Sequence, residues 1–340
     1  MEPVELRSDT FTKPTPEMRR AMADAVVGDD VWGEDPTANA LQEQCAELFG
    51  KEAGLFVPSG SMGNEAAIKA QTSPGEEIIA EANSHIVAAE LGAPATISQV
   101  LVRVLRGDRG AFDPGELASA INPPARFTSH TALVCLENTH WASGGAVIPI
   151  DVFKGLSKIV RERSVRLHLD GARLFNASVA SGVHVREFAA EVDTLSFCFS
   201  KGLGAPIGSM LLGPHDVIDR ARRVRKMLGG GMRQVGVLCA AAKVALETGV
   251  ERLAEDHANA KRFAEGLADA WPGSVDPAVV ETNIIWVDTG DRDALSVERN
   301  LRENGVFVRA TDDHTLCCYT HRDVDETGVE RALDAFRALA

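Results

Sequence analysis

The feature that most constrains the fold is an alternation of short apolar runs with helical patterns between about residues 50 and 215. The apolar runs are nearly continuous, as is typical of parallel strands buried on both faces of a sheet. Helical patterns lie between several of them. This arrangement predicts an α/β fold with a mostly parallel central sheet and helices on both faces. The strand-like runs are residues 54–60, 77–83, 132–138, 166–170, 195–200 and 208–213, and two of the helical patterns are 61–72 and 152–163.

The pattern changes after the glycine-rich stretch "LGGGMRQ". A long helical pattern over residues 234–270 precedes a mixture of short strands and helices, which is typical of a small α+β domain. We therefore predict an N-terminal arm over residues 1–30, a large α/β domain over 31–233 and a small C-terminal domain over 234–340. Within the small domain we expect strands at 282–289, 306–310 and 316–321, and helices at 292–304 and from 325 onward.

The composition excludes several classes of partner. The formal net charge is −14, whereas nucleic acids and anionic membrane surfaces require a basic protein face. No apolar run is long enough to span a bilayer, and the N-terminus lacks the pattern of a signal peptide. The six cysteines are scattered, and most lie in apolar strand-like runs, as reduced core residues do. We expect a cytoplasmic protein that acts on a small molecule, with no nucleic-acid or membrane partner.

Several of the predicted strands end in polar residues. Ligands of open α/β sheets bind beyond the carboxyl ends of the strands, so these residues are candidates for one shared site. Ser59-Gly60-Ser61 ends one strand and opens a helix, where free N–H groups and a close backbone approach suit a phosphate. Asp170 ends another strand, and Lys201 follows a third within "SFCFSKGLG". A buried lysine is costly unless it has a partner or a chemical role.

A phosphate cradle, a carboxylate and a lysine are what pyridoxal 5'-phosphate requires. The lysine holds the cofactor aldehyde as a Schiff base, and the carboxylate keeps the pyridine nitrogen protonated. Each residue also has an ordinary structural interpretation: Lys201 as a surface residue, Asp170 as a turn cap and Ser59-Gly60-Ser61 as a helix N-cap. Their order, and their shared place at strand ends, favours a cofactor site.

Along nearly its whole length the chain resembles the threonine aldolase family of fold type I pyridoxal phosphate enzymes, which share an aspartate aminotransferase-like fold. The resemblance implies a lyase that cleaves L-β-hydroxy-α-amino acids, such as threonine or allo-threonine, to glycine and an aldehyde by a retro-aldol reaction. The stretches that carry it are "LRSDTFTKPT", "DDVWGEDPT", "LFVPSGSMGNEAA", "ANSHIVAAELGA", "LENTH", "LHLDGARLFNA", "SFCFSKGLGAPIGS", "RKMLGGGMRQ" and "THRDV".

The resemblance assigns roles to residues around the cofactor. Lys201 would form the Schiff base, and Asp170 would hold the pyridine nitrogen. His85 would stack on the cofactor ring, and Arg173 would lie near its phenolic oxygen and the substrate. Because active sites of this family are built at a dimer interface, the phosphate would be bound from two subunits, by Gly60, Ser61 and Ser200 of one and Arg233 of the other.

The resemblance also implies roles in substrate binding and proton transfer. A retro-aldol step requires removal of the β-hydroxyl proton, and His85 and His140 are both candidates for handling it. The choice between them, or a water molecule, stays open. Ser8 would contact the substrate carboxylate. The implied assembly is a homo-oligomer, at least a dimer, with a tetramer expected.

Three positions depart from the family pattern. Cys317, in "CCYTH", stands where the family has an arginine that binds the substrate carboxylate, and cysteine cannot form that bidentate contact. We hypothesise that Arg309, on the preceding strand, supplies the guanidinium instead. Trp32 and Trp141 replace other residues of the family pattern, and they either reshape the pocket or act as packing residues. The alternatives within the same cofactor frame are a β-eliminating lyase, a transaldolase and a transaminase.

The sequence also contains partial matches to two other kinds of site. The stretch "GLGAPIG" nearly matches a dinucleotide-binding loop, but a strand-like run follows it where that loop requires a helix. His314, Cys317, Cys318 and His321 suggest zinc, yet adjacent cysteines on a strand point to opposite faces. A non-catalytic binding protein would be expected to lack part of the cofactor constellation, which is complete here. We predict no metal site.

Overall fold

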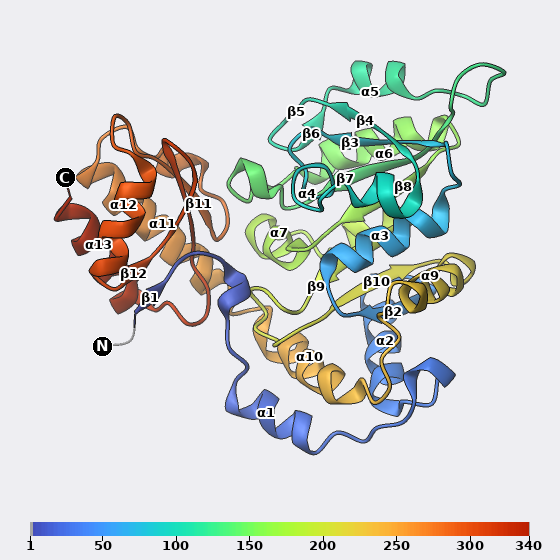
Figure 1. Cartoon of the computed structure of the whole chain (residues 1–340), viewed down its shortest axis with the longest axis horizontal. Coiled ribbons are helices and arrows are strands. Elements are labelled where there is room, and N and C mark those ends of the chain that lie inside the picture. The colour runs from blue at the N-terminus through green and yellow to red at the C-terminus, as the bar shows by residue number, and fades with distance from the viewer. Residues whose placement is uncertain (1–2, 340) are drawn as a thin grey trace.

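A seven-stranded sheet forms the centre of the large domain (Figure 1). The computed structural model describes residues 3–339. Within this sheet one strand, the second in spatial order, runs antiparallel to both of its neighbours, and the other strands are parallel. The predicted α/β class is therefore confirmed. In spatial order the strands are β2 (Ala53–Val57), β10 (Ser209–Gly213), β9 (Thr194–Cys198), β8 (Arg166–Asp170), β7 (Thr131–Glu137), β3 (Glu77–Glu81) and β4 (Leu101–Leu105).

The edge strand β4 is the one strand of this sheet that the apolar runs did not predict. Its sequence "LVRVL" has Arg103 at the centre, and both Leu101 and Val104 are exposed. An edge strand covered on one side does not need the continuous apolar run that marks the central strands.

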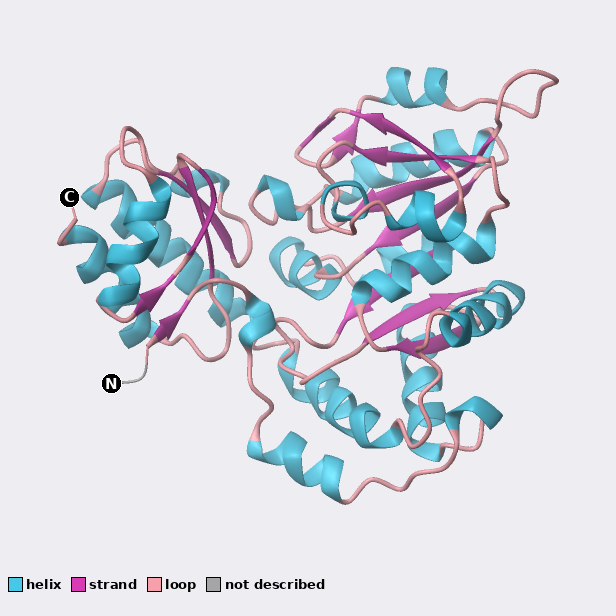
Figure 2. Ribbon diagram, viewed as in Figure 1, coloured by secondary structure: helices cyan, strands magenta, loops and turns pink. Residues whose placement is uncertain are grey.

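Helices cover both faces of the sheet (Figure 2). On one face α3 (Gly60–Gln71) and α9 (His215–Met227) pack against β2 and β10. The other face is covered mainly by α2 (Pro36–Phe49), α6 (Ile150–Glu162), α8 (Val185–Ala190) and α10 (Gly236–Gly249), which share the largest apolar cluster. Shorter helices are α1 (Pro16–Ala23), α4 (His85–Ala88), α5 (Pro114–Ala120) and α7 (Leu174–Ser181).

Aromatic rings fix the end of β9, which leads to Lys201. The ring centroid of Phe197 lies 5.0 Å from that of Phe49, 5.3 Å from Phe175 and 4.8 Å from Phe199. All four side chains are buried, and burying such a ring stabilises the fold by about 1.5–3 kcal/mol. The loop that carries the lysine therefore starts from a rigid strand.

The small domain contains an antiparallel sheet in the order β11 (Ile284–Asp288), β14 (Thr315–Tyr319) and β13 (Arg309–Asp312). The helices α11 (Leu253–Ala270), α12 (Ala294–Glu303) and α13 (Glu326–Arg337) pack around a second apolar cluster with one face of this sheet. The other face carries Ile284, Cys317 and Tyr319, which pack with Trp286 and with Trp141 of the large domain. This second face therefore meets the large domain.

The N-terminal arm joins the two domains. Its strand β1 (Val4–Glu5) pairs in parallel with β12 (Val306–Phe307) of the small domain, while α1 packs against α10 of the large domain. The predicted helical pattern over 234–270 forms two helices. Leu253, the first residue of α11, belongs to the large-domain cluster, and Phe263 of the same helix belongs to the small-domain cluster. The two apolar clusters therefore divide within α11, whereas the predicted domain boundary lies at residue 234.

All six cysteines are free and buried. Between residues 3 and 339, no helix combines the length and the apolar character needed to cross a membrane.

Candidate active site

A cavity of about 210 Å³ opens at the carboxyl-terminal edge of the central sheet. Segments that follow β2, β3, β7, β8 and β9 form its wall, so it lies where the strand ends predicted a site. A larger cavity of about 720 Å³ lies among α2, α7, α8 and α10, and its lining includes no lysine. The chemistry assigns the site to the smaller cavity. Its lining includes Thr10, Ser59, Gly60, Ser61, Asn64, His85, Glu90, Glu137, Thr139, Trp141, Asp170, Ala172, Arg173, Cys198, Ser200 and Lys201.

The predicted phosphate cradle lies at the N-terminus of α3. Ser59 caps the helix, and its Oγ accepts a backbone N–H of the first turn at 3.2 Å. The remaining first-turn N–H groups have no intrahelical acceptor and form the positive end of the helix dipole, so they favour an anion. A Cβ on Gly60 would come within 2.9 Å of Cys198 Sγ, so a larger residue would crowd the cradle. Gly60, Ser61 and Ser200 all line the cavity.

Asp170 lies in the cavity wall and is 3% exposed. Its Oδ1 accepts the N–H of Ala172 at 3.0 Å, and its Oδ2 accepts Nδ2 of Asn64 at 2.8 Å. The amide oxygen of Asn64 in turn accepts the hydroxyl of Ser196 at 2.8 Å and faces Nε2 of His168 at 3.2 Å. Both carboxylate oxygens are thus held within the protein, which fixes the orientation of Asp170 toward the cavity.

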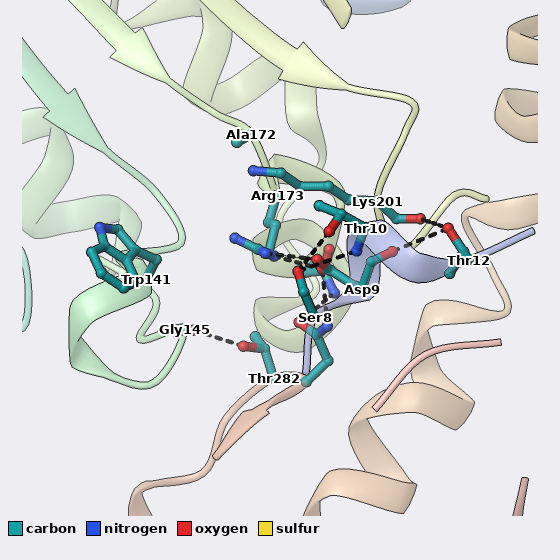
Figure 3. Close-up of polar contacts among 12 residues, drawn as sticks. Ser8, Asp9, Thr10, Thr12, Trp141, Gly145, Ala172, Arg173, Lys201 and Thr282 are labelled. Carbon is teal, nitrogen blue, oxygen red and sulfur yellow. Dashed lines mark hydrogen bonds and ion pairs between the residues drawn. The ribbon is translucent and has the colours of Figure 1, made fainter. Parts of the chain in front are cut away.

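Lys201 lines the same cavity directly after Ser200. Its backbone carbonyl accepts the hydroxyl of Thr12 at 3.1 Å, which ties the lysine loop to the arm. In Figure 3 its side chain extends from this anchor, with its nitrogen at the end nearer Ala172. An amine, a carboxylate and an anion-binding helix end therefore meet in one cavity. This set of donors and acceptors fits pyridoxal phosphate.

His85 lines the cavity beside Trp141, and the two rings are nearly perpendicular with centroids 6.4 Å apart. The backbone N–H of His85 donates to Glu137 at 2.5 Å, and its Nδ1 lies 2.8 Å from Oε1 of Glu90. Burial and the charge of Asp170 raise the pKa of Glu137, against the hydrogen bonds from two backbone N–H groups. The ring is held at Nδ1, so Nε2 is the nitrogen available to a ligand.

The structure places His140 outside the cavity. Its buried ring has Nε2 at 3.0 Å from Oε2 of Glu81 and Nδ1 at 2.9 Å from Oγ of Ser143. Burial lowers the pKa of this imidazole although the nearby Glu81 charge acts in the opposite direction. Its chain neighbours Thr139 and Trp141 line the cavity. His140 therefore anchors the loop that carries these two residues.

Arg173 and Asp9 form a buried ion pair where the arm crosses the cavity (Figure 3). Nε and Nη2 of Arg173 donate to the two oxygens of Asp9 at 2.6 and 2.7 Å, and the Tyr319 ring lies 5.3 Å from the guanidinium carbon. Burial alone would raise the pKa of Asp9, but the charge and hydrogen bonds of Arg173 lower it to about 2. Ser8 lies next to this pair, and its Oγ accepts the N–H of Thr10, which lines the cavity.

One row of side chains crosses the small sheet on the face that meets the large domain. Trp286, Cys317 and Arg309 lie directly opposite one another on β11, β14 and β13, so they share this face. Trp286 packs against Trp141 at 6.0 Å between ring centroids and donates Nε1–H to its carbonyl at 3.2 Å. Burial raises the pKa of Cys317, against the interaction with Tyr319 and the charges of Arg309 and Arg173. Arg309 itself is exposed.

Ser8 and Arg309 do not line the cavity, and two further residues predicted near the site lie on the exposed surface. Arg233 is exposed on the surface and forms an ion pair with Asp29 at 3.0 Å. Trp32 is 76% exposed and does not line the cavity. Both side chains are accessible to another molecule.

The four residues considered for zinc are not gathered into one site. Cys317 and Cys318 belong to different apolar clusters on opposite faces of β14. The rings of His314 and His321 face backbone carbonyl oxygens of two different segments, at 3.1 and 2.9 Å.

The polar residues at the site that were not among the candidates taken from the sequence include Thr10, Asn64, Glu90, Glu137 and Thr139, which line the cavity, and Asp9, which pairs with Arg173. Glu137 is the last residue of β7, so the strand-end argument that selected Asp170 also applies to it. Asn64 lies one turn into α3, just after the predicted cradle. Glu90 and Asp9 give no comparable signal, because their partners lie in other segments of the chain.

Comparisons with known proteins agree on one family. A family model described as beta-eliminating lyase matches residues 5–290. Low-specificity L-threonine aldolase 1 of Arabidopsis thaliana is 43% identical over 99% of this chain and 96% of the plant protein. The low specificity L-threonine aldolase of Escherichia coli (strain K12) is 40% identical over 99% of each chain. Among solved structures, the threonine aldolase of Leishmania major superposes with a TM-score of 0.83 at 19% identity, covering 99% of each chain.

Proposed function

The chain belongs to the beta-eliminating lyase family, and we propose that it is a pyridoxal phosphate-dependent aldolase. The reaction is the cleavage of threonine-like L-β-hydroxy-α-amino acids to glycine and an aldehyde. One observation carries this proposal: Lys201, Asp170 and the N-terminus of α3 meet in a single cavity. The relatives that match the full chain at 40–43% identity are named low-specificity L-threonine aldolases, which supports this choice of reaction.

Each part of the cavity has a task in this proposal. Lys201 binds the cofactor aldehyde, Asp170 binds the pyridine nitrogen, and the free N–H groups of Gly60 and Ser61 bind the phosphate with Ser200. When bound, the cofactor supplies a sink for the electron pair that remains on Cα as the Cα–Cβ bond breaks. The protein must hold the substrate so that this bond is the one that breaks, and must move the β-hydroxyl proton.

We assign the proton transfer to His85 rather than to His140. His85 lines the cavity, and it contacts Glu90 through Nδ1, which leaves Nε2 available. Both ring nitrogens of His140 already have partners away from the cavity. Nε2 of His85 is therefore the atom that accepts the hydroxyl proton in this proposal. A neutral imidazole is well suited to this step near neutral pH.

We assign the substrate carboxylate to Arg309. Two guanidinium nitrogens of Arg173 already donate to Asp9, and the side chain of Cys317 has no cationic group. Arg309 lies opposite Cys317 on the face of the small sheet that meets the large domain, and its charge acts on the thiol. In this proposal a carboxylate bound beside Cys317 would contact the guanidinium of Arg309 on β13. Charge-assisted bonds of this kind are among the stronger polar contacts in proteins.

We further propose a homo-oligomer in which a second subunit completes the site. Arg233, the arginine assigned to a neighbouring subunit's phosphate, is exposed and lies outside the cavity of its own chain. Trp32, at 76% exposure, is a large apolar side chain on the surface that such a contact would cover. A tetramer and a cytoplasmic location stay predictions.

The proposal is tested by product analysis with purified, cofactor-loaded protein. L-Threonine, L-allo-threonine, L-phenylserine and L-serine are each supplied, and aldehyde and glycine are measured separately. We expect aldehyde and glycine in equal amounts from at least one threonine isomer. Release of a keto acid and ammonia without aldehyde would instead assign the chain to β-elimination, and the absence of any product from a cofactor-loaded protein would reject the aldolase.

A further inference from the structure

A chain of buried side chains lies behind the cavity. Nε2 of Gln71 donates to Oγ1 of Thr194 at 2.9 Å, and the same oxygen lies 2.9 Å from Nδ1 of His168. Nε2 of His168 lies 3.2 Å from Oδ1 of Asn64. None of these four residues is more than 8% exposed, so the protein itself must satisfy their polar atoms.

The position of each proton in this chain follows from Asn64. Its Nδ2 lies 2.9 Å from Oε1 of Glu90 and 2.8 Å from Oδ2 of Asp170, so the amide nitrogen, not the oxygen, must face the two carboxylates. The amide oxygen is then an acceptor, and Nε2 of His168 must carry the proton that faces it. Nδ1 of His168 accepts the hydroxyl proton of Thr194 in turn. Burial lowers the pKa of His168 to about 4, in agreement with a neutral ring.

Glu90 continues this chain of hydrogen bonds to His85. Its Oε1 accepts from Asn64 and lies 2.8 Å from Nδ1 of His85. The oxygen that accepts from Asn64 also accepts from His85, so Nδ1 of His85 carries a proton, and Nε2 of the neutral ring then has the lone pair. The side chain of Glu90 is 1% exposed and that of His85 34% exposed, so the carboxylate lies behind the ring and the ring faces the cavity.

We propose that Glu90 is a positioning residue that fixes the tautomer of His85. The amide of Asn64 holds Glu90 and Asp170 in one arrangement, so the histidine and the carboxylate of the cofactor site are oriented by the same side chain. Second partners of this kind commonly set the tautomer and direction of a functional histidine. The inference deepens the proposed function and rests on it, because the free Nε2 is the atom assigned to the β-hydroxyl proton.

The test is nitrogen NMR of cofactor-loaded protein that contains ring-¹⁵N-labelled histidine, at a pH at which the His85 ring is neutral. The His85→Asn variant identifies the signals of that ring. In the wild type we expect a proton on Nδ1 and none on Nε2. In Glu90→Gln this preference is lost, because the glutamine amide can also donate to Nδ1. A wild-type ring protonated at Nε2, or an unchanged tautomer in Glu90→Gln, would overturn the proposal.

Glu65→Gln is the matched control. Glu65 is also a buried glutamate near Glu90, but its carboxyl oxygens form no hydrogen bond to His85. We expect its substitution to leave the His85 tautomer as it is in the wild type. An equal change of tautomer in Glu65→Gln would mean that any neighbouring carboxyl has the effect, and would remove the specific role of Glu90.

A kinetic measurement separates positioning from a purely structural role. We expect Glu90→Gln to lower kcat by about 10- to 100-fold with little change in KM, and Glu90→Asp to recover part of the loss. Lower thermal stability with wild-type kcat would contradict the proposal. The tautomer is measured without substrate, so it is decided independently of whether the protein releases aldehyde, and failure of the proposed function is visible separately in the wild-type product assay.

Discussion

The two ends of the cavity are assembled in different ways. The cofactor end, formed by Gly60, Asp170 and Lys201, consists of loops that directly follow strands of one sheet. The carboxylate end, where Arg173 lines the cavity and Arg309 is the residue proposed to bind the substrate, requires the arm and the small domain to meet the large domain. In the proposed function, cofactor binding would thus depend on a single core, whereas substrate recognition would depend on how two cores come together.

The polar groups at the two ends are also stabilised differently. At the cofactor end Asn64 uses its amide nitrogen and its oxygen in four hydrogen-bonding contacts. At the carboxylate end Asp9 and Arg173 lose their hydration and compensate with one bidentate ion pair between the arm and the large domain. A change at the cofactor end should therefore affect chemistry, and a change at the carboxylate end should affect substrate affinity.

The largest effect is expected at the cofactor end, from Lys201→Ala. Without the amine that binds the cofactor, we expect aldehyde release to fall by at least about 10³-fold, since loss of a covalent catalytic group costs up to about 10⁶-fold. The rate is measured with added pyridoxal phosphate and compared with Lys158→Ala, which removes a surface lysine. Near-normal turnover by Lys201→Ala would mean that another group performs its task.

The next largest effect should separate the two histidines. We expect His85→Asn to lower kcat by about 10²-fold, because it removes the proton acceptor in the cavity. His140→Asn should leave kcat within about tenfold of the wild type and instead lower the free energy of unfolding by about 1–3 kcal/mol, because buried Glu81 loses a partner. Both are checked by steady-state kinetics and denaturant unfolding. A greater kcat loss in His140→Asn would move the proton transfer to that residue.

At the carboxylate end, Arg309→Ala should raise KM by about 10- to 100-fold with a small change in kcat, as expected for the loss of a charge-assisted contact. The control is Arg299→Ala, which removes an exposed arginine of α12. Adding Cys317→Arg to Arg309→Ala returns a guanidinium to the same row of the sheet, and we expect it to lower KM again. An unchanged KM in Arg309→Ala would leave the carboxylate to another residue.

The smallest effect on turnover is expected from Glu65, whose role at the cofactor end concerns stability and its dependence on pH. Burial and the charge of Glu90 raise the pKa of Glu65 to about 8, although Lys69 on the same helix opposes this shift. The native state therefore holds a proton that the unfolded chain has lost. Its stabilising contribution is complete below the ordinary pKa of 4.5 and disappears as the pH rises through about 8.

Glu65→Gln should make the free energy of unfolding less dependent on pH. We expect the stability of the wild type to fall between pH 5 and 9 by on the order of 4 kcal/mol more than that of the variant. Thermal or denaturant unfolding of cofactor-loaded protein measures the difference, with the exposed Glu116→Gln as control. Equal slopes for wild type and Glu65→Gln would show that Glu65 is ionised in the native protein.

The cofactor end was predictable from the sequence because each of its residues lies next to, or at the end of, the strand that positions it. Each of Gly60, Asp170 and Lys201 follows an apolar run that could only be a buried strand, and parallel strands bring their carboxyl ends to one edge. The edge strand β4 escaped prediction because Arg103 interrupts its run and one side of it is exposed. Glu137 obeys the same strand-end rule, although the motifs did not single it out.

The carboxylate end was predictable only in part because its contacts are long-range. Nothing near Asp9 in the sequence indicates that it pairs with Arg173, 164 positions away. The sequence also does not distinguish the direction of His140 from that of its neighbours Thr139 and Trp141, yet the fold turns the ring of His140 toward Glu81 and its neighbours toward the cavity. Arg309 was suggested by the departure at Cys317, and their direct pairing across β13 and β14 is a property of the fold.

The most direct test of this division is a binding titration followed by the absorbance of the bound cofactor. Glycine, which has the carboxylate, and methylamine, which lacks it, are added to the wild type and to Arg309→Ala. We predict that both proteins retain the cofactor and bind methylamine equally, while the Kd for glycine rises by about 10- to 100-fold in Arg309→Ala. Equal glycine affinity in the two proteins would contradict the assignment of the carboxylate end, and loss of the cofactor from Arg309→Ala would contradict the separation of the two ends.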